Sequence, residues 1–142
     1  MEKKYNWMDG KMVIALGRTY REAHCKSMEL FRENGLTMPQ FTVLEVLYNK
    51  GDLTIQQIIN KVLSSSGNMT VVIRNLEQLG LVGRYKNPDD SRSFIISITD
   101  KGRRLMDKVF PKHMENLANA FRKITDEEKE TVVNILKKLK KS

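Results

Sequence analysis

The stretch from Ser65 to Gln78 combines apolar and polar side chains in helical spacing. When Met69, Ile73 and Leu76 are turned inward at about 100° per residue, a mostly polar face lies opposite them. That face consists of Gly67, Val71, Arg74 and Gln78, with Thr70 and Asn75 at its edges. It carries one arginine and no acidic residue before Glu77, whereas the exposed face of an ordinary helix usually displays glutamate and lysine.

The chemistry of this face matches the major groove of DNA. An arginine such as Arg74 can bond guanine through two hydrogen bonds, asparagine and threonine can reach base edges or phosphates, and an outward valine can touch a thymine methyl group. At the N-terminal end, Ser65 and Ser66 would aim free backbone N–H groups at phosphates, and Gly67 would allow a close approach. The alternative interpretation is an ordinary amphipathic helix with a serine cap.

A second polar group follows in a region of period-two spacing. Segments 82–86 and 94–98 read as two strands separated by turn-forming residues, which predicts a β-hairpin. Asp90 and Arg92 lie two residues apart and would point the same way, so the carboxylate could fix the guanidinium for insertion into a minor groove. Two further hairpin cations would lie along the adjoining phosphate backbone: Arg84 and Lys86. Taken alone, the Asp90–Arg92 pair could also be an exposed ion pair worth about 1 kcal/mol or less.

Helices must position these residues. Apolar residues at alternating spacings of three and four predict a long helix over about 9–33. Shorter helices are predicted over about 37–50, 54–63 and 68–80, then from Thr99 with a kink or boundary near Pro111, and finally from Thr125. Thr54 with Gln57, and the segment 125–128, fit capping boxes. The fold class is therefore mainly α with a small β-hairpin wing: a winged helix-turn-helix with flanking helices.

Composition supports a polyanionic partner. The chain of 142 residues is long enough for one domain with a core, and its formal net charge is +8. Cys25 is the only cysteine, which suits a reducing compartment. The N-terminus lacks the apolar run of a signal peptide, and no stretch approaches the length needed to span a bilayer. We therefore expect a cytoplasmic, nucleoid-associated protein without a membrane partner.

Residues 36–105 resemble the signature of the MarR family of bacterial transcriptional regulators. The resemblance runs in order through Leu36-Thr37, Pro39-Gln40-Phe41, Leu44, Leu53-Thr54, Ser66-Gly67-Asn68-Met69-Thr70, Leu76-Glu77, Gly80-Leu81-Val82, Arg84, Asp90-Ser91-Arg92-Ser93 and Ser97-Ile98-Thr99-Asp100-Lys101-Gly102. Each piece is weak, but the ordered set is specific. The flanking helices also match the family in order and length.

The resemblance implies a single MarR-type domain that works as a homodimer on a pseudo-palindromic DNA operator. The winged helix-turn-helix lobe would span about 36–100, with dimerisation helices over about 5–33 and 103–142. Recognition-helix contacts carried over by position are Ser66, Asn68, Thr70, Val71 and Arg74, and Asp90 with Arg92 corresponds to the wing pair. Repression is the expected effect.

Family members often bind small aromatic or phenolic effectors between the dimer helices and the DNA-binding lobe. Here such a pocket could be lined by Trp7, Met12, Tyr20, Met38 and Phe41, although a methionine and aromatic cluster is more often plain core. One branch of the family senses peroxides through a cysteine and two tyrosines. The corresponding positions here hold Val13, Ser27 and Met38, so the cysteine and both tyrosines are missing from them. Cys25 lies elsewhere on the helix, and thiol sensing through it is a secondary alternative.

Two other classes of function are alternatives. A winged-helix module could bind protein through its hairpin edge, and a small enzyme could use Cys25 or a histidine. His24 and Cys25 diverge by about 100° on a helix, and no phosphate loop or nucleophile–base pair supports catalysis. His24 and His113 are too few for a zinc site. We therefore expect neither a metal, nor a cofactor, nor enzymatic activity.

Overall fold

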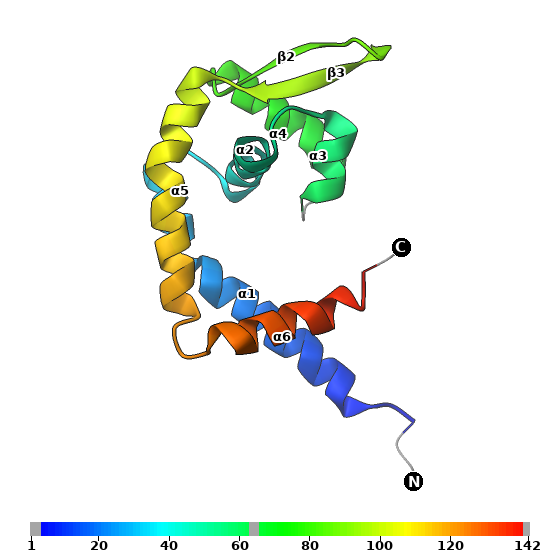
Figure 1. Ribbon diagram of the computed structural model, residues 1–142, viewed down its shortest axis with the longest axis vertical. Coiled ribbons are helices and arrows are strands. Elements are labelled where there is room, and N and C mark those ends of the chain that lie inside the picture. The colour runs from blue at the N-terminus through cyan, green and yellow to red at the C-terminus, as the bar shows by residue number, and fades with distance from the viewer. Residues whose placement is uncertain (1–3, 63–65, 141–142) are drawn as a thin grey trace. The chain divides into compact units, whose positions relative to one another are not determined.

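The computed structural model describes residues 4–62 and 66–140, and it divides into two compact units (Figure 1). Unit 2 is the continuous segment Ser27–His113, and unit 1 combines the chain up to Lys26 with the chain from Met114 onward. Two helices contribute to both units: α1 (Trp7–Glu33) and α5 (Asp100–Ala120). We predicted a kink or a helix boundary near Pro111. A boundary there is excluded, because α5 continues through that residue, and the kink stays a prediction.

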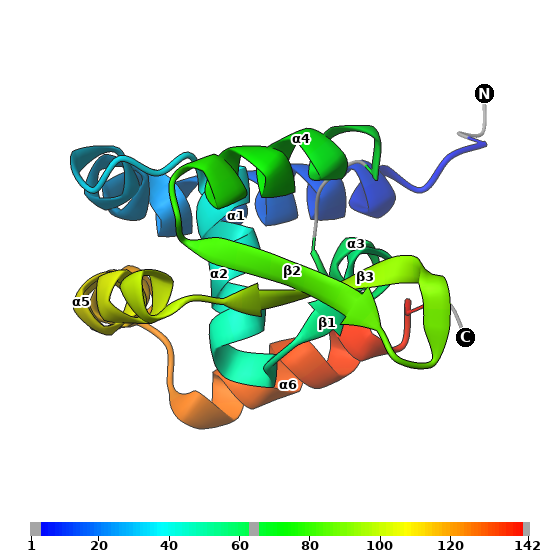
Figure 2. The ribbon, with the colours of Figure 1, turned by 90° about the horizontal axis from the view of Figure 1, so that it is seen from above.

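Unit 2 contains the predicted helices and hairpin together with a third strand. Its further helices are α2 (Met38–Lys50), α3 (Ile55–Lys61) and α4 (Ser66–Gln78). Its antiparallel sheet has the order β1-β3-β2, made of β1 (Leu53–Thr54), β3 (Asp90–Ile98) and β2 (Val82–Asn87) (Figure 2). The sequence pattern did not predict β1, since two residues are too few to show an alternation. β1 pairs with β3 through Leu53 opposite Ile96.

The core of unit 2 is assembled from one face of each element. Val43, Leu44 and Ile58 are fully buried, and so are Ile73 and Leu76 on α4. The rest of the core cluster includes Phe31, Phe41, Leu47, Met69, Ile96, Met106 and Val109. Burying this many aliphatic side chains, at roughly 25 cal/mol per Å² of apolar surface, is what makes the unit stable.

Local signals fix where the helices begin and end. The predicted capping boxes at Thr54 and Thr125 are confirmed, and Thr37 forms a further one with Gln40. In each box the two side chains satisfy backbone N–H groups that a helix start leaves unpaired. Gly51 ends α2 with a φ of 89°, and Gly80 follows α4 with a φ of 74°, a region that glycine adopts without strain.

The hairpin is longer than predicted. Asn87 and Asp90, which we assigned to the turn, are the last residue of β2 and the first of β3. The strands therefore continue almost to the tip, with a register irregularity after Lys86. Leu79 lies just beyond the end of α4 and is 43% exposed.

Unit 1 leaves most of its apolar side chains exposed in the single chain. α6 (Asp126–Lys137) has no buried residue. Val13 is 71% exposed and Ile135 is 51% exposed, although both belong to apolar helix faces. Such faces normally pack against another surface.

The turn between α4 and the hairpin is clamped by the start of α5. Thr99 Oγ1 donates a hydrogen bond to the Gly80 carbonyl at 2.7 Å, and Lys101 Nζ donates to the Leu79 carbonyl at 2.7 Å. Thr99 Oγ1 also accepts from the Gly102 N–H at 3.1 Å, so Thr99 caps α5 as predicted. A Cβ on Gly102 would lie 2.2 Å from the Leu81 carbonyl oxygen, so only glycine fits there.

We predict that Gly102→Ala destabilises unit 2 by about 1–3 kcal/mol, because the added methyl group forces α5 away from the Leu81 backbone. The measurement is chemical denaturation followed by circular dichroism. Gly83→Ala is the matched control, since an added Cβ there meets nothing within 4 Å. Equal stability of the two variants would show that the close approach at Gly102 is not required.

Candidate nucleic-acid interface

The two faces of α4 are divided as the sequence predicts. Met69 is 1% exposed and Ile73 is 0% exposed, whereas Val71 on the opposite face is 45% exposed. The exposed residues of α4 also include Asn68, Thr70, Arg74, Asn75 and Gln78. Ser65 lies outside the described residues, and Ser66 and Gly67 form the first turn of the helix. That these residues contact DNA stays a prediction.

The exposed face of α4 is favourable to an anion. Its first turn contains no acidic residue, so no carboxylate within that turn offsets the partial positive charge at the N-terminal end of the helix. Arg74 is exposed, and within the described part of the chain it has no ion-pair partner. Its guanidinium is therefore available to a ligand.

The tip of the hairpin is organised by short side-chain hydrogen bonds. Asp90 Oδ1 accepts the backbone N–H of Arg92 at 3.0 Å and lies 3.6 Å from Arg92 Nε. Asn87 Oδ1 accepts the Asp89 N–H at 3.0 Å, and its amide nitrogen donates to Ser93 Oγ at 3.0 Å. The predicted pairing of Asp90 with Arg92 is thus present, while the Arg92 side chain remains 93% exposed. The tip presents a guanidinium to solvent on an ordered turn.

Arg84 and Lys86 have different surroundings. The Arg84 guanidinium contacts both carboxylate oxygens of Glu77, which we did not foresee, and this hydrogen bonding raises the pKa of Arg84. Lys86 is exposed, with no ion-pair partner among the residues that the structure describes. Of the two cations expected along the phosphate backbone, only Lys86 is free of a carboxylate.

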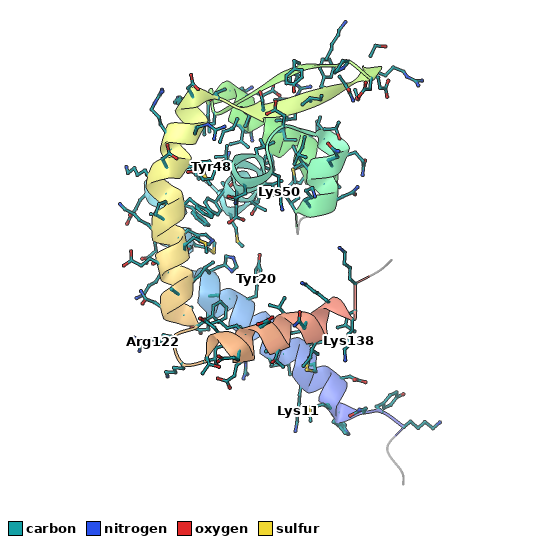
Figure 3. The ribbon with its side chains drawn as sticks, in the orientation of Figure 1. Lys11, Tyr20, Tyr48, Lys50, Arg122 and Lys138 are labelled. Carbon is teal, nitrogen blue, oxygen red and sulfur yellow. The ribbon has the colours of Figure 1, made fainter. Side chains whose placement is uncertain are left out.

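Two tyrosines connect elements of unit 2. The Tyr85 hydroxyl donates to Asp52 Oδ2 at 2.8 Å, and this hydrogen bond raises the pKa of Tyr85. The Tyr48 hydroxyl, labelled in Figure 3, donates to Asp107 Oδ1 at 2.5 Å. The first bond links β2 to the residue before β1, and the second links α2 to α5. Both support the elements that carry the interface.

A buried polar network joins the first and the last residue of unit 2. Ser27 Oγ and His113 Nδ1 are 2.8 Å apart, and both residues are buried. His113 Nε2 lies 3.8 Å from Glu45 Oε2, and the His113 ring packs edge-on against Phe41 at 4.8 Å between centroids. In the sequence, the one signal for this network is a serine within an apolar helix face. A nucleophilic hydroxyl must be accessible to its substrate, whereas the Ser27 side chain is 0% exposed.

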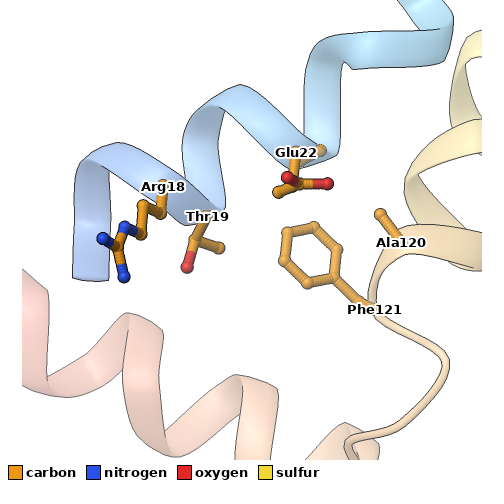
Figure 4. A pocket seen from close by; sticks show the side chains of 6 residues that line it. Arg18, Thr19, Glu22, Ala120 and Phe121 are labelled. Carbon is orange, nitrogen blue, oxygen red and sulfur yellow. The ribbon is translucent and has the colours of Figure 1, made fainter. Parts of the chain in front are cut away.

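The predicted effector residues are distributed over both units. Trp7, Met12 and Tyr20 belong to unit 1 and are 64%, 42% and 46% exposed. Met38 and Phe41 belong to unit 2, where Phe41 stacks on Phe31 with 4.0 Å between centroids. A separate cavity of about 230 Å³ lies within unit 1 (Figure 4). It is lined by Arg18, Thr19, Glu22, Ala23, Ala120 and Phe121, none of which we predicted.

Two further candidates for chemistry, His24 and Cys25, are neighbours on α1. Cys25 is exposed, and the His24 ring donates to the Tyr20 carbonyl at 2.8 Å. Over residues 4–62 and 66–140 there is no group of three or more His, Cys, Asp or Glu side chains placed to hold a metal ion. In the same ranges, no helix has the length and apolarity that crossing a membrane requires.

Solved structures share this architecture. BpsR of Bordetella bronchiseptica, whose DNA binding is regulated by 6-hydroxynicotinic acid, matches with a TM-score of 0.82 at 21% identity, covering 99% of each chain. NadR in complex with 4-hydroxyphenylacetate matches with a TM-score of 0.79 at 19% identity, covering 98% of this chain and 96% of NadR. The fold is that of the winged helix-turn-helix proteins.

Sequence comparison identifies the family. The MarR family profile matches residues 36–94. The chain is 36% identical over 129 residues to the HTH-type transcriptional regulator MhqR of Bacillus subtilis strain 168, which covers 91% of this chain and 89% of MhqR. The chain therefore belongs to the MarR family of transcriptional regulators.

We predict that Ser27→Ala destabilises unit 2 by about 1–3 kcal/mol, because it removes a hydrogen-bond partner from the buried His113 ring. Thermal unfolding followed by calorimetry is the measurement. Ser91→Ala on the exposed hairpin is the control and should leave the unfolding temperature unchanged. A Ser27→Ala variant as stable as the control would mean that the Ser27–His113 bond adds nothing to stability.

Proposed function

We propose that this protein is a homodimeric repressor that binds a pseudo-palindromic DNA operator. The observation that carries the proposal is the exposed face of α4, which has Arg74 at its centre and lies in the same compact unit as the Arg92 wing tip. The formal net charge of +8 adds a general attraction to a polyanion.

In the proposed complex, α4 lies in a major groove. Its N-terminal turn, with Ser66, Gly67 and Asn68, approaches phosphates, where backbone N–H groups and the helix dipole favour negative charge. Farther along, Arg74 bonds a guanine, while Thr70, Val71 and Asn75 meet neighbouring base edges. Arg92 enters the adjacent minor groove, held in orientation by Asp90.

A second copy of the chain provides the other half of the site. The exposed apolar residues of unit 1 on α1 and α6, such as Val13, Leu16, Val132 and Ile135, supply the kind of surface that a stable homodimer buries. In a two-fold dimer the two α4 helices would enter successive major grooves about one turn, ~34–36 Å, apart. An operator of matching symmetry follows from that geometry.

A small aromatic or phenolic ligand is the proposed signal. Support comes from two proteins of the same fold, NadR and BpsR, whose ligands are 4-hydroxyphenylacetate and 6-hydroxynicotinic acid. In this chain Met12 and Tyr20 are 42% and 46% exposed, so a ligand can reach both side chains. A ligand that binds better to a dimer whose α4 spacing does not match DNA would release the operator.

The direct test is a footprint of the purified protein on the DNA upstream of its own gene. We expect protection over two related half-sites about one helical turn apart, together with a strong loss of affinity on raising the salt concentration. Protection without sequence preference, or no binding at low salt, would refute the proposed function.

We predict that Arg92→Ala lowers operator affinity about 10- to 100-fold and makes the salt dependence less steep, because one charge-assisted contact is lost. A mobility-shift titration at several salt concentrations measures both quantities. Sedimentation should show an unchanged dimer. Lys108→Ala, which removes an exposed cation from α5, is the control. An Arg92→Ala variant that binds like this control would remove the wing tip from the interface.

We predict that Arg74→Ala relaxes base preference by about 1–3 kcal/mol at one position in each half-site, because a bidentate contact with guanine is lost. The measurement is competition binding to a panel of operators, each with one substituted base pair. Other positions should keep their preference. If the affinity for every operator falls equally, Arg74 contacts phosphate. If no affinity changes, Arg74 is a solvent-exposed residue that does not contact DNA.

A further inference from the structure

Arg84 forms the tightest charged contact described in unit 2. Its Nε donates to Glu77 Oε1 and Oε2 at 3.1 and 3.0 Å, and its Nη2 also contacts Oε1. The two side chains are 33% and 27% exposed, so the pair is partly shielded from water. The contact spans 7 residues of sequence, from the last turn of α4 across the Gly80 turn to β2. It connects the exposed helix with the hairpin.

The same guanidinium also touches the second strand of the hairpin. Arg84 Cζ lies 5.3 Å from the centre of the Phe94 ring, and Phe94 is on β3, opposite Lys86. A planar guanidinium can bond a carboxylate at its edge while packing on an aromatic ring with its face, which lysine cannot do. Arg84 therefore joins α4, β2 and β3 through one side chain.

Arg84 and Arg92 differ in how far a neighbouring carboxylate neutralises their charge. Glu77 is the only acidic residue of α4, and unneutralised it would repel DNA phosphates. Arg84 cancels that charge, so the pair as a whole adds little attraction for DNA. Arg92 is 93% exposed and lies a looser 3.6 Å from its carboxylate. The two arginines of one hairpin are thus placed for different tasks.

We propose that Arg84 is a positioning residue: through Glu77 and Phe94 it braces the wing against α4, so that both reach DNA in a fixed mutual orientation. This inference rests on the proposed function, and it replaces our expectation that Arg84 contacts the phosphate backbone. Ordering a hairpin during association weakens binding, and a brace that orders it beforehand removes that cost.

Three single variants distinguish a brace from a phosphate contact. If Arg84 is a brace, Glu77→Ala lowers operator affinity about three- to tenfold although it removes a negative charge near DNA. If Arg84 contacts phosphate, the same variant frees its guanidinium and binds more tightly. Arg84→Lys separates the two roles again, since lysine keeps the charge but not the bidentate geometry. We expect Arg84→Lys to bind nearly as weakly as Arg84→Met.

A double-mutant cycle completes the test. With Glu77 already replaced by alanine, Arg84→Met should cause little further loss of affinity, because the carboxylate that ties Arg84 to α4 is gone and the Phe94 contact lies within the hairpin. Lys86→Met is the matched control for a phosphate contact on the same strand, and it should reduce the slope of log K against log salt by about 0.9. Tighter binding by Glu77→Ala, or wild-type binding by Arg84→Lys, would overturn the proposal.

A measurement on the free protein keeps this proposal separate from the proposed function. Loss of the brace should speed amide hydrogen exchange in β2 and the tip, in Glu77→Ala and Arg84→Met alike, while the core of α2 stays protected. If the wild type binds no operator, the proposed function fails but this exchange result still decides whether Arg84 braces the wing. Unchanged exchange in both variants would overturn the brace.

Discussion

The direction of the hairpin relative to α4 depends on one close approach, between the Leu81 backbone and the first turn of α5. Because residue 102 has no side chain, α5 can begin directly against that backbone. From this position Thr99 and Lys101 donate to the carbonyls of Gly80 and Leu79, in the turn that follows α4. The exposed face of α4 and the wing are held by the same few contacts.

Periodicity was sufficient to predict the helices of unit 2, because each buries one continuous face. The inward spacing of Met69, Ile73 and Leu76 is visible in the sequence, and so are the threonine caps. The strand β1 was missed since its two residues are defined by their pairing with β3 and not by a pattern of their own. The turn was predicted too long for a related reason: polar residues at a hairpin tip can continue a ladder when both strand faces are solvated.

The candidate site was predicted where it depends on local sequence, and missed where it depends on tertiary contact. Outward placement of Arg74 follows from helical spacing alone, and the Asp90–Arg92 pair from a separation of two residues. The partner of Arg84 could not be identified in this way, because the distance between α4 and β2 is set by packing elsewhere. Ser27 and His113 are 86 residues apart, and no local pattern relates them.

The residues proposed to read DNA contribute little to the core that holds them in place. Arg92 is almost wholly solvated, and Val71 is exposed on a helix whose other face is completely buried. Substitutions at such positions change folding energy little, whereas changes on the opposite face alter it strongly. After gene duplication, one copy could therefore acquire a new target sequence by drift along a single surface while its scaffold remained intact.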